Sequence, residues 1–238
     1  MVIEDEIDFT EASEMSHKVR SYVESSFEHE LPGEGDRLFV DRPIERGNML
    51  NFWPYEVHGN HCRGYCDAAR LVGSQILLGP YQSDHMVMPL AFLYHHALEL
   101  SLKCGIYEAE RANGRTAREA FDLVYGEESK YGHSLKKLWQ KYRCVMFRFS
   151  EHQPDYKMRM NAAEKLIEEF DGFGKSGFLF RYQRDRKAAK SYLLEEQTEE
   201  APYRRPNATM MNVRVFVSSA EKLLNLISGL QDDIPDAL

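Results

Sequence analysis

Three ionisable side chains share one stripe of a strongly apolar segment and could act together on a ligand. His96, Glu99 and Lys103 are three or four residues apart, the spacing that aligns side chains on one face of an α-helix. Most other positions of the segment are apolar, and a helix that is apolar around most of its circumference is usually buried. Because buried charges must be paired or must line a cavity, the stripe predicts either a structural polar network or a ligand site.

Both interpretations of the stripe stay open at this point. As a site, Lys103 would attract a phosphate-bearing ligand as a point charge, and Glu99 would orient His96. As structure, Glu99 and Lys103 would form a buried ion pair that fixes how helices pack. A Glu four residues before a Lys is also a common pair on helix surfaces.

Farther along the chain, His133 precedes Ser134, a residue type that favours the N-cap of a helix. Exposed N–H groups at a helix start attract anions and disfavour protonation of a nearby imidazole. A neutral His133 could therefore take the proton of a ribose 2′-hydroxyl. Alternatively, His133 caps the helix or forms a hydrogen bond with Glu99 across the bundle.

Arg181 and Tyr182 form a third group of candidate site residues and directly follow the apolar residues 178–180. The guanidinium of Arg181 could clamp a phosphate with two N–H groups, or pair with Glu99. Tyr182 offers a stacking face or a hydrogen bond, although tyrosines of this kind are more often part of the core.

Composition restricts the classes of function. A net charge of −8 argues against a surface that grips nucleic acid as a whole. The chain has two basic runs, residues 136–148, which begin with Lys136, and residues 181–190. These runs could form a local groove that faces phosphates, although such runs usually form solvated helix faces or loops. No apolar run is long enough for a membrane span, and the acidic N-terminus does not resemble a secretory signal, so a cytoplasmic protein is expected.

Neither a metal nor a cofactor is expected. A cluster of His58, His61, Cys62 and Cys66 has residue types that bind zinc, but its spacing matches no common zinc pattern. The glycine-rich residues 172–177 lack the preceding strand and the full spacing of a phosphate-binding loop.

The elements that must position these groups are predicted to be helical. Apolar residues recur at helical spacing, and Gly and Pro separate the segments. Helices are expected over residues 10–29, 62–78, about 88–111, 116–125, 158–171 and 209–230, with another that begins after Ser134, and extended segments over 38–40 and 178–182. The prediction is an all-α fold: residues 1–60 form an N-terminal helical arm and a loop-rich connector, and 61–238 a bundle of about five helices with an irregular insertion near 172–207.

Three motifs in this order resemble HEPN domains (higher eukaryotes and prokaryotes nucleotide-binding). They are residues 97–103 (ALELSLK), 133–138 (HSLKKL) and 181–185 (RYQRD), in which Gln183 replaces the usual Pro. The resemblance covers roughly residues 62–230. It implies a helical bundle, often dimeric, that binds nucleotides or cleaves RNA, commonly with a cognate antitoxin or within an antiphage defence system.

One departure from the family bears on activity. Ribonuclease members carry an Arg followed, after four to six intervening residues, by a His, and no Arg of this chain has that spacing. The nearest approach is Arg148 and His152, with three residues between them.

Two hypotheses follow. In the first, the protein is a metal-independent endoribonuclease, with His133 or His96 as the base and with Arg181 and Lys103 as anion stabilisers. In the second, it is a non-catalytic module that binds a nucleotide or a protein. The residues expected to hold a nucleotide or phosphate are Lys103, Glu99, Tyr182 and Lys136.

Overall fold

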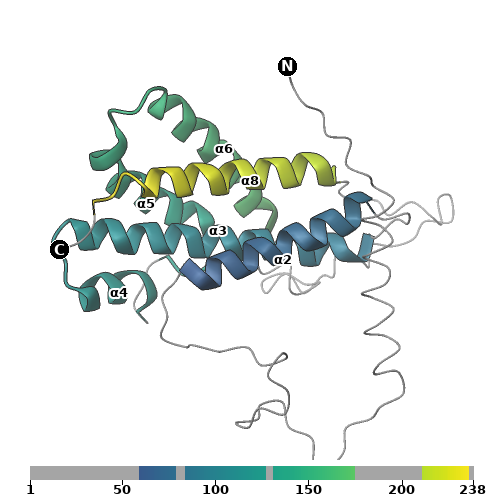
Figure 1. Ribbon diagram of the computed structural model, residues 1–238, viewed down its shortest axis with the longest axis horizontal. Coiled ribbons are helices and arrows are strands. Elements are labelled where there is room, and N and C mark those ends of the chain that lie inside the picture. The colour runs from purple at the N-terminus through teal and green to yellow at the C-terminus, as the bar shows by residue number, and fades with distance from the viewer. Residues whose placement is uncertain (1–58, 79–83, 127–130, 175–210, 236–238) are drawn as a thin grey trace, which may run out of the picture.

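A computed structural model describes residues 59–78, 84–126, 131–174 and 211–235, and the regular structure of these ranges is entirely helical (Figure 1). The helices are α2 (Gly59–Leu78), α3 (Asp84–Ala112), α4 (Ala117–Tyr125), α5 (Leu135–Ser150), α6 (Tyr156–Gly174) and α8 (Val213–Gln231). This confirms the predicted all-α class. The expected helix over 10–29, the extended segments and most of the insertion lie outside the described residues.

Helix α3 is the centre of the bundle. It contacts α2, α4, α5 and α8, and α6 packs against α5. In Figure 1, α2 and α8 lie along α3, and α4 folds back beside its C-terminal half. Helix α3 is therefore covered on several sides, as its apolar pattern predicts.

Several helix boundaries differ from the prediction by a few residues: α2 begins at Gly59, α6 at Tyr156 and α8 at Val213. Two further differences involve helix breakers. Helix α3 begins at Asp84, four residues before the predicted start, so Pro89 lies in the second turn rather than the first. A proline there removes one backbone hydrogen bond, and the turn before it has no other helix breaker. Helix α6 continues through Gly172 to Gly174 instead of stopping at Asp171, because a glycine costs a helix only about 1 kcal/mol.

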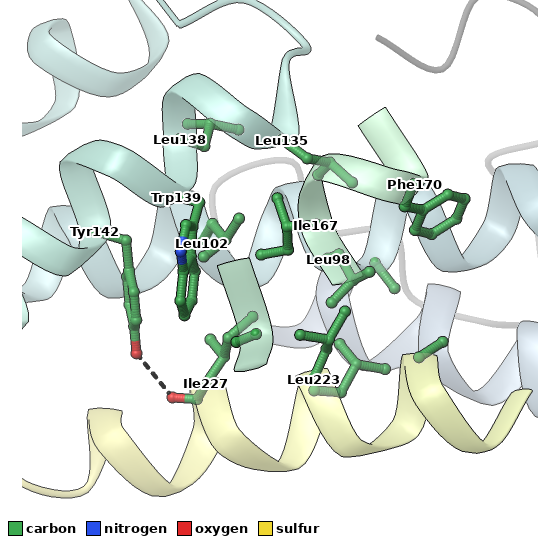
Figure 2. Packing of buried hydrophobic residues seen from close by; sticks show 14 of the residues in the cluster. Leu98, Leu102, Leu135, Leu138, Trp139, Tyr142, Ile167, Phe170, Leu223 and Ile227 are labelled. Atoms are coloured by element: carbon green, nitrogen blue, oxygen red, sulfur yellow. Dashed lines mark hydrogen bonds between the residues drawn. The ribbon is translucent and has the colours of Figure 1, made fainter. Parts of the chain in front are cut away.

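The core lies between α3, α5, α6 and α8 (Figure 2). Its fully or almost fully buried side chains come from all four helices: Leu98, Leu102, Leu135, Leu138, Trp139, Ile167, Leu223 and Ile227. The phenol of Tyr142 donates a hydrogen bond to the carbonyl oxygen of Ile227 at 3.0 Å. This bond ties α5 to α8 at one end of the core.

A polar network ties α8 to α2 and α3. The guanidinium of Arg70 on α2 donates to both carboxylate oxygens of Glu221 on α8, at 3.0 and 2.9 Å. Tyr94 on α3 donates to the same carboxylate at 2.9 Å. The network fixes the position of α8 relative to α2 and α3.

At Gly105, side chains of α5 and α8 come close to the backbone of α3. A Cβ atom at this position would lie 2.5 Å from the Tyr142 ring and 2.6 Å from the side-chain nitrogen of Gln231. Neither neighbour can move freely, since Tyr142 is bonded to Ile227 and Gln231 donates to the carbonyl of Ser101 at 2.9 Å. A glycine is therefore required where α3, α5 and α8 meet.

We expect Gly105→Ala to lower the free energy of unfolding by about 2 kcal/mol, because the added methyl group overpacks a restrained contact. Gly229→Ala is the matched control: it lies in α8 with nothing within 4 Å of its added Cβ, so it should stabilise by roughly 0.5–1 kcal/mol. Urea denaturation of both variants measures the effect. Equal stability of the two variants would contradict the close approach at Gly105.

Candidate acid-base site

Glu99 is the centre of the polar stripe on α3. One of its carboxylate oxygens, Oε1, accepts from the Lys103 ammonium at 2.8 Å and contacts Nδ1 of His133 at 2.9 Å. The other oxygen, Oε2, lies 3.6 Å from Nδ1 of His96. A single carboxylate on α3 thus collects three of the predicted site residues, including His133 from the start of α5.

The carboxylate is almost fully buried, with 3% of its side chain exposed. Burial is the largest single influence and raises the pKa of Glu99, but His96, Lys103 and His133 together outweigh it and bring the pKa to about 2. Glu99 is therefore ionised throughout the neutral range. An ionised carboxylate only accepts hydrogen bonds, so the imidazole nitrogen of His133 that faces it must carry a proton.

His133 connects this buried charge to solvent, because 58% of its side chain is exposed. The hydrogen bond with Glu99 across the bundle, one of the alternatives that the sequence left open, is present in the structure. With Nδ1 held by Glu99, Nε2 is the nitrogen left to meet a ligand.

The N-terminus of α5 beside His133 already holds a carboxylate of this chain. Ser134 is the N-cap, as predicted, and its hydroxyl accepts from the Lys137 amide at 3.3 Å. Asp171, from the end of α6, accepts from the Leu135 amide at 2.8 Å. The local anion site at this helix start is thus used to join α6 to α5.

His96 is enclosed by aromatic rings. Its imidazole packs edge-on against Tyr65 of α2, with ring centroids 4.3 Å apart, and stacks on Phe92 at 5.8 Å. Only 25% of its side chain is exposed. Its contact with Glu99 is longer than that of His133, so Glu99 orients His133 more directly than His96.

Lys103 is fastened on two sides. Besides its bond to Glu99, the ammonium lies 5.5 Å from the centre of the Tyr125 ring, a cation–π distance, and 11% of its side chain is exposed. The ion pair of the structural interpretation is therefore present. Lys103 balances the charge of Glu99 and holds its carboxylate in position from the buried side of the site.

The basic run on α5 is paired with groups of this chain. Lys136 forms an ion pair with Glu168 of α6 at 2.7 Å, and both side chains are about half exposed. The other pairs of the run are Lys141 with Glu110, Arg143 with Glu164, and Arg148 with Asn113. This pattern is typical of a solvated helix face with ion pairs.

The remaining predicted site residues, Arg181 and Tyr182, lie outside the described ranges, as does His58. In the parts of the chain that the structure describes, no three His, Cys, Asp or Glu side chains are grouped so that they could hold a metal ion. Likewise, none of the described helices is long and apolar enough to cross a membrane.

Comparisons with known proteins do not identify the site. A scan against protein-family models, a search of curated proteins and a search of solved structures each gave no match. The resemblance to HEPN domains is therefore carried by the motif residues alone.

Removing the buried charge should destabilise the bundle strongly. Glu99→Gln leaves the Lys103 ammonium without its partner, and breaking a buried pair in this way costs about 3–5 kcal/mol. Urea denaturation at pH 7 measures the loss. Glu169→Gln, at an exposed position of α6, is the control and should change stability by less than about 0.5 kcal/mol.

The difference between wild type and Glu99→Gln should depend on pH. The pKa of Glu99 falls from 4.5, its ordinary value, to about 2 in the folded protein. A carboxyl group whose pKa is lowered by folding stabilises the protein above its unfolded pKa, and this contribution is lost as the pH falls. The difference should therefore be constant above pH 4.5 and shrink from there toward pH 2. A difference independent of pH between 5 and 3 would contradict the assigned pKa shift.

Proposed function

We propose that this protein is a HEPN-like domain that acts on RNA or nucleotides, with His133 as its acid–base group. The observation that supports the proposal is the 2.9 Å contact between the exposed imidazole of His133 and the buried, charge-neutralised carboxylate of Glu99. A carboxylate that fixes the tautomer of an exposed histidine is the arrangement used in acid–base catalysis. The order of the three sequence motifs directs that chemistry toward RNA.

The reaction that fits is transesterification of RNA. The Nδ1–H group of His133 donates a hydrogen bond to Glu99. The other ring nitrogen, Nε2, takes the proton of a ribose 2′-hydroxyl. The 2′-oxygen attacks the adjacent phosphorus, the P–O5′ bond breaks, the leaving 5′-oxygen takes a proton from water, and a 2′,3′-cyclic phosphate results. Glu99 stabilises the imidazolium that forms, and Lys103 keeps that carboxylate ionised and in place.

The other predicted residues take secondary places in this proposal. His96 shares the carboxylate and is the second candidate acid or base. Arg181, with Tyr182, is the proposed clamp for the phosphate, and Lys136 would lie at the edge of the site. On the resemblance alone, the proposal includes a homodimer and a cognate antitoxin or defence-system protein as partners.

RNA cleavage by the pure full-length protein in EDTA tests the catalytic role. We expect cleavage that ends in 2′,3′-cyclic phosphates, and a fall of about 100-fold or more in rate for His133→Ala, the typical contribution of a positioned acid–base group. His152→Ala is the matched control, because His152 is an exposed histidine in the turn that follows the C-cap of α5. No cleavage, or cleavage unaffected by His133→Ala, would overturn the catalytic version.

A second candidate function is a non-catalytic nucleotide- or protein-binding module. Two observations favour it: the cations of α5 are already paired within the chain, and the Arg–His spacing of ribonuclease members is absent. The Glu99 cluster would then hold the helices in place while a ligand contacts His133.

Thermal unfolding with a panel of nucleotides separates the two candidates. A ligand present at a hundred times its dissociation constant adds about 2.7 kcal/mol to the stability of the folded state. A rise in the unfolding temperature without turnover would support the binding module. No rise with any nucleotide, together with no cleavage of RNA, would leave a protein-interaction role.

A further inference from the structure

Two cysteine thiols face each other on α2, beside the Glu99 cluster and outside the proposed acid–base chemistry. The sulfur of Cys62 lies 4.0 Å from that of Cys66, one helical turn later. It also lies 2.8 Å from the hydroxyl oxygen of Ser101 and 3.6 Å from the carbonyl oxygen of Ala97, both on α3. Cys62 is thus held between two helices by three polar contacts.

These contacts favour the thiolate form of Cys62. The hydrogen bond from the Cys66 thiol is the largest cause that lowers its pKa; burial opposes it, and Ser101 and the charges of Arg70 and His96 add to it, giving a pKa of about 6. The same bond raises the pKa of Cys66, which therefore remains a protonated thiol. One nucleophilic sulfur and one protonated sulfur thus lie side by side.

The two sulfurs also differ in access. Cys62 is partly exposed near the N-terminal end of α2, whereas Cys66 belongs to the core, with 7% of its surface exposed. A small oxidant meets Cys62 first, and Cys66 lies within reach of the product.

We propose that Cys62 and Cys66 form a thiol-oxidation site, in which a hydroperoxide oxidises Cys62 and Cys66 then closes a disulfide with it. This site is independent of the proposed action on RNA or nucleotides.

The two steps balance. The Cys62 thiolate attacks the distal oxygen of the hydroperoxide, the O–O bond breaks, and a sulfenic acid and an alkoxide (or hydroxide) form. The Cys66 sulfur then attacks the sulfur of that sulfenic acid; an S–S bond forms, the S–O bond breaks, and the hydroxyl leaves as water with the Cys66 proton. The two cysteines together lose two electrons, which reduce the hydroperoxide.

Closing the disulfide requires a local change in α2. Side chains four residues apart on a helix have Cβ atoms about 5–6 Å apart, whereas a disulfide needs about 3.5–4.5 Å. Cys62 is the fourth residue of α2, so few residues precede it in the helix and the change is confined to the first turns. Tyr65, which packs on His96, lies in the same region.

Peptide mapping by mass spectrometry tests the proposal on the full chain. After a few equivalents of hydrogen peroxide at neutral pH, we expect a Cys62–Cys66 disulfide that a reductant reverses. Cys66→Ser should instead accumulate a sulfenic acid on Cys62, trapped as a dimedone adduct. Cys62→Ser should leave Cys66 reduced.

The rate of alkylation by iodoacetamide gives a second readout, first on the wild-type protein. The rate of modification of Cys62 should rise with a midpoint near pH 6. Cys144, an exposed cysteine on α5, is the internal control. Ser101→Ala should raise the midpoint for Cys62, because the hydrogen bond from the hydroxyl is lost.

Three results would overturn the proposal. The first is that Cys62 stays reduced under conditions that oxidise Cys144. The second is a disulfide that joins Cys62 to a cysteine other than Cys66. The third is a pH profile of Cys62 with its midpoint at or above the ordinary thiol range of about 8–9.

Discussion

The ionised carboxylate of Glu99 is the interaction on which the other parts of the site depend. Taking a carboxylate out of water is unfavourable unless charges and hydrogen-bond donors replace the solvent. Lys103 supplies the compensating charge from the next turn of α3. His96 on α3 and His133, just before the N-cap of α5, supply further contacts. The need to satisfy one buried charge therefore brings the start of α5 against the middle of α3.

The rest of the bundle keeps that contact in register. Large apolar side chains from four helices fill the space behind the polar stripe, and Gly105 lets α5 and α8 approach α3 closely. The network of Arg70, Tyr94 and Glu221 places α8 against α2 and α3. Apolar packing supplies the stability of the bundle, while the carboxylates of Glu99 and Glu221 determine which helix faces meet.

The sequence alone predicted the helical class, the polar stripe and Ser134 as an N-cap, because these follow from local spacing and residue type. It also included the contact between His133 and Glu99 among its alternatives but could not choose it, since the choice depends on how α5 packs against α3. The same limit hid Tyr125 beside Lys103 and Ser101 beside Cys62. No spacing rule marks partners that come from different helices.

The helix boundaries show the same limit on a smaller scale. Pro89 and Gly172 are helix breakers by residue type, yet α3 and α6 continue through them. A proline in the second turn removes one backbone hydrogen bond and a glycine costs about 1 kcal/mol, and residue type alone does not show whether a helix tolerates that cost. Arg181 and Tyr182 lie outside the described residues, so their part in the site remains a prediction.

The carboxylate of Asp171 carries one more implication. It belongs to the end of α6, yet it holds the first amide of α5, 36 residues earlier in the chain, and so fixes the backbone next to His133. A side chain that must be positioned to within about half an ångström depends on such supports as much as on its direct partner. Under the proposed function, substitutions of Asp171 would therefore weaken the acid–base role of His133 without touching the imidazole itself.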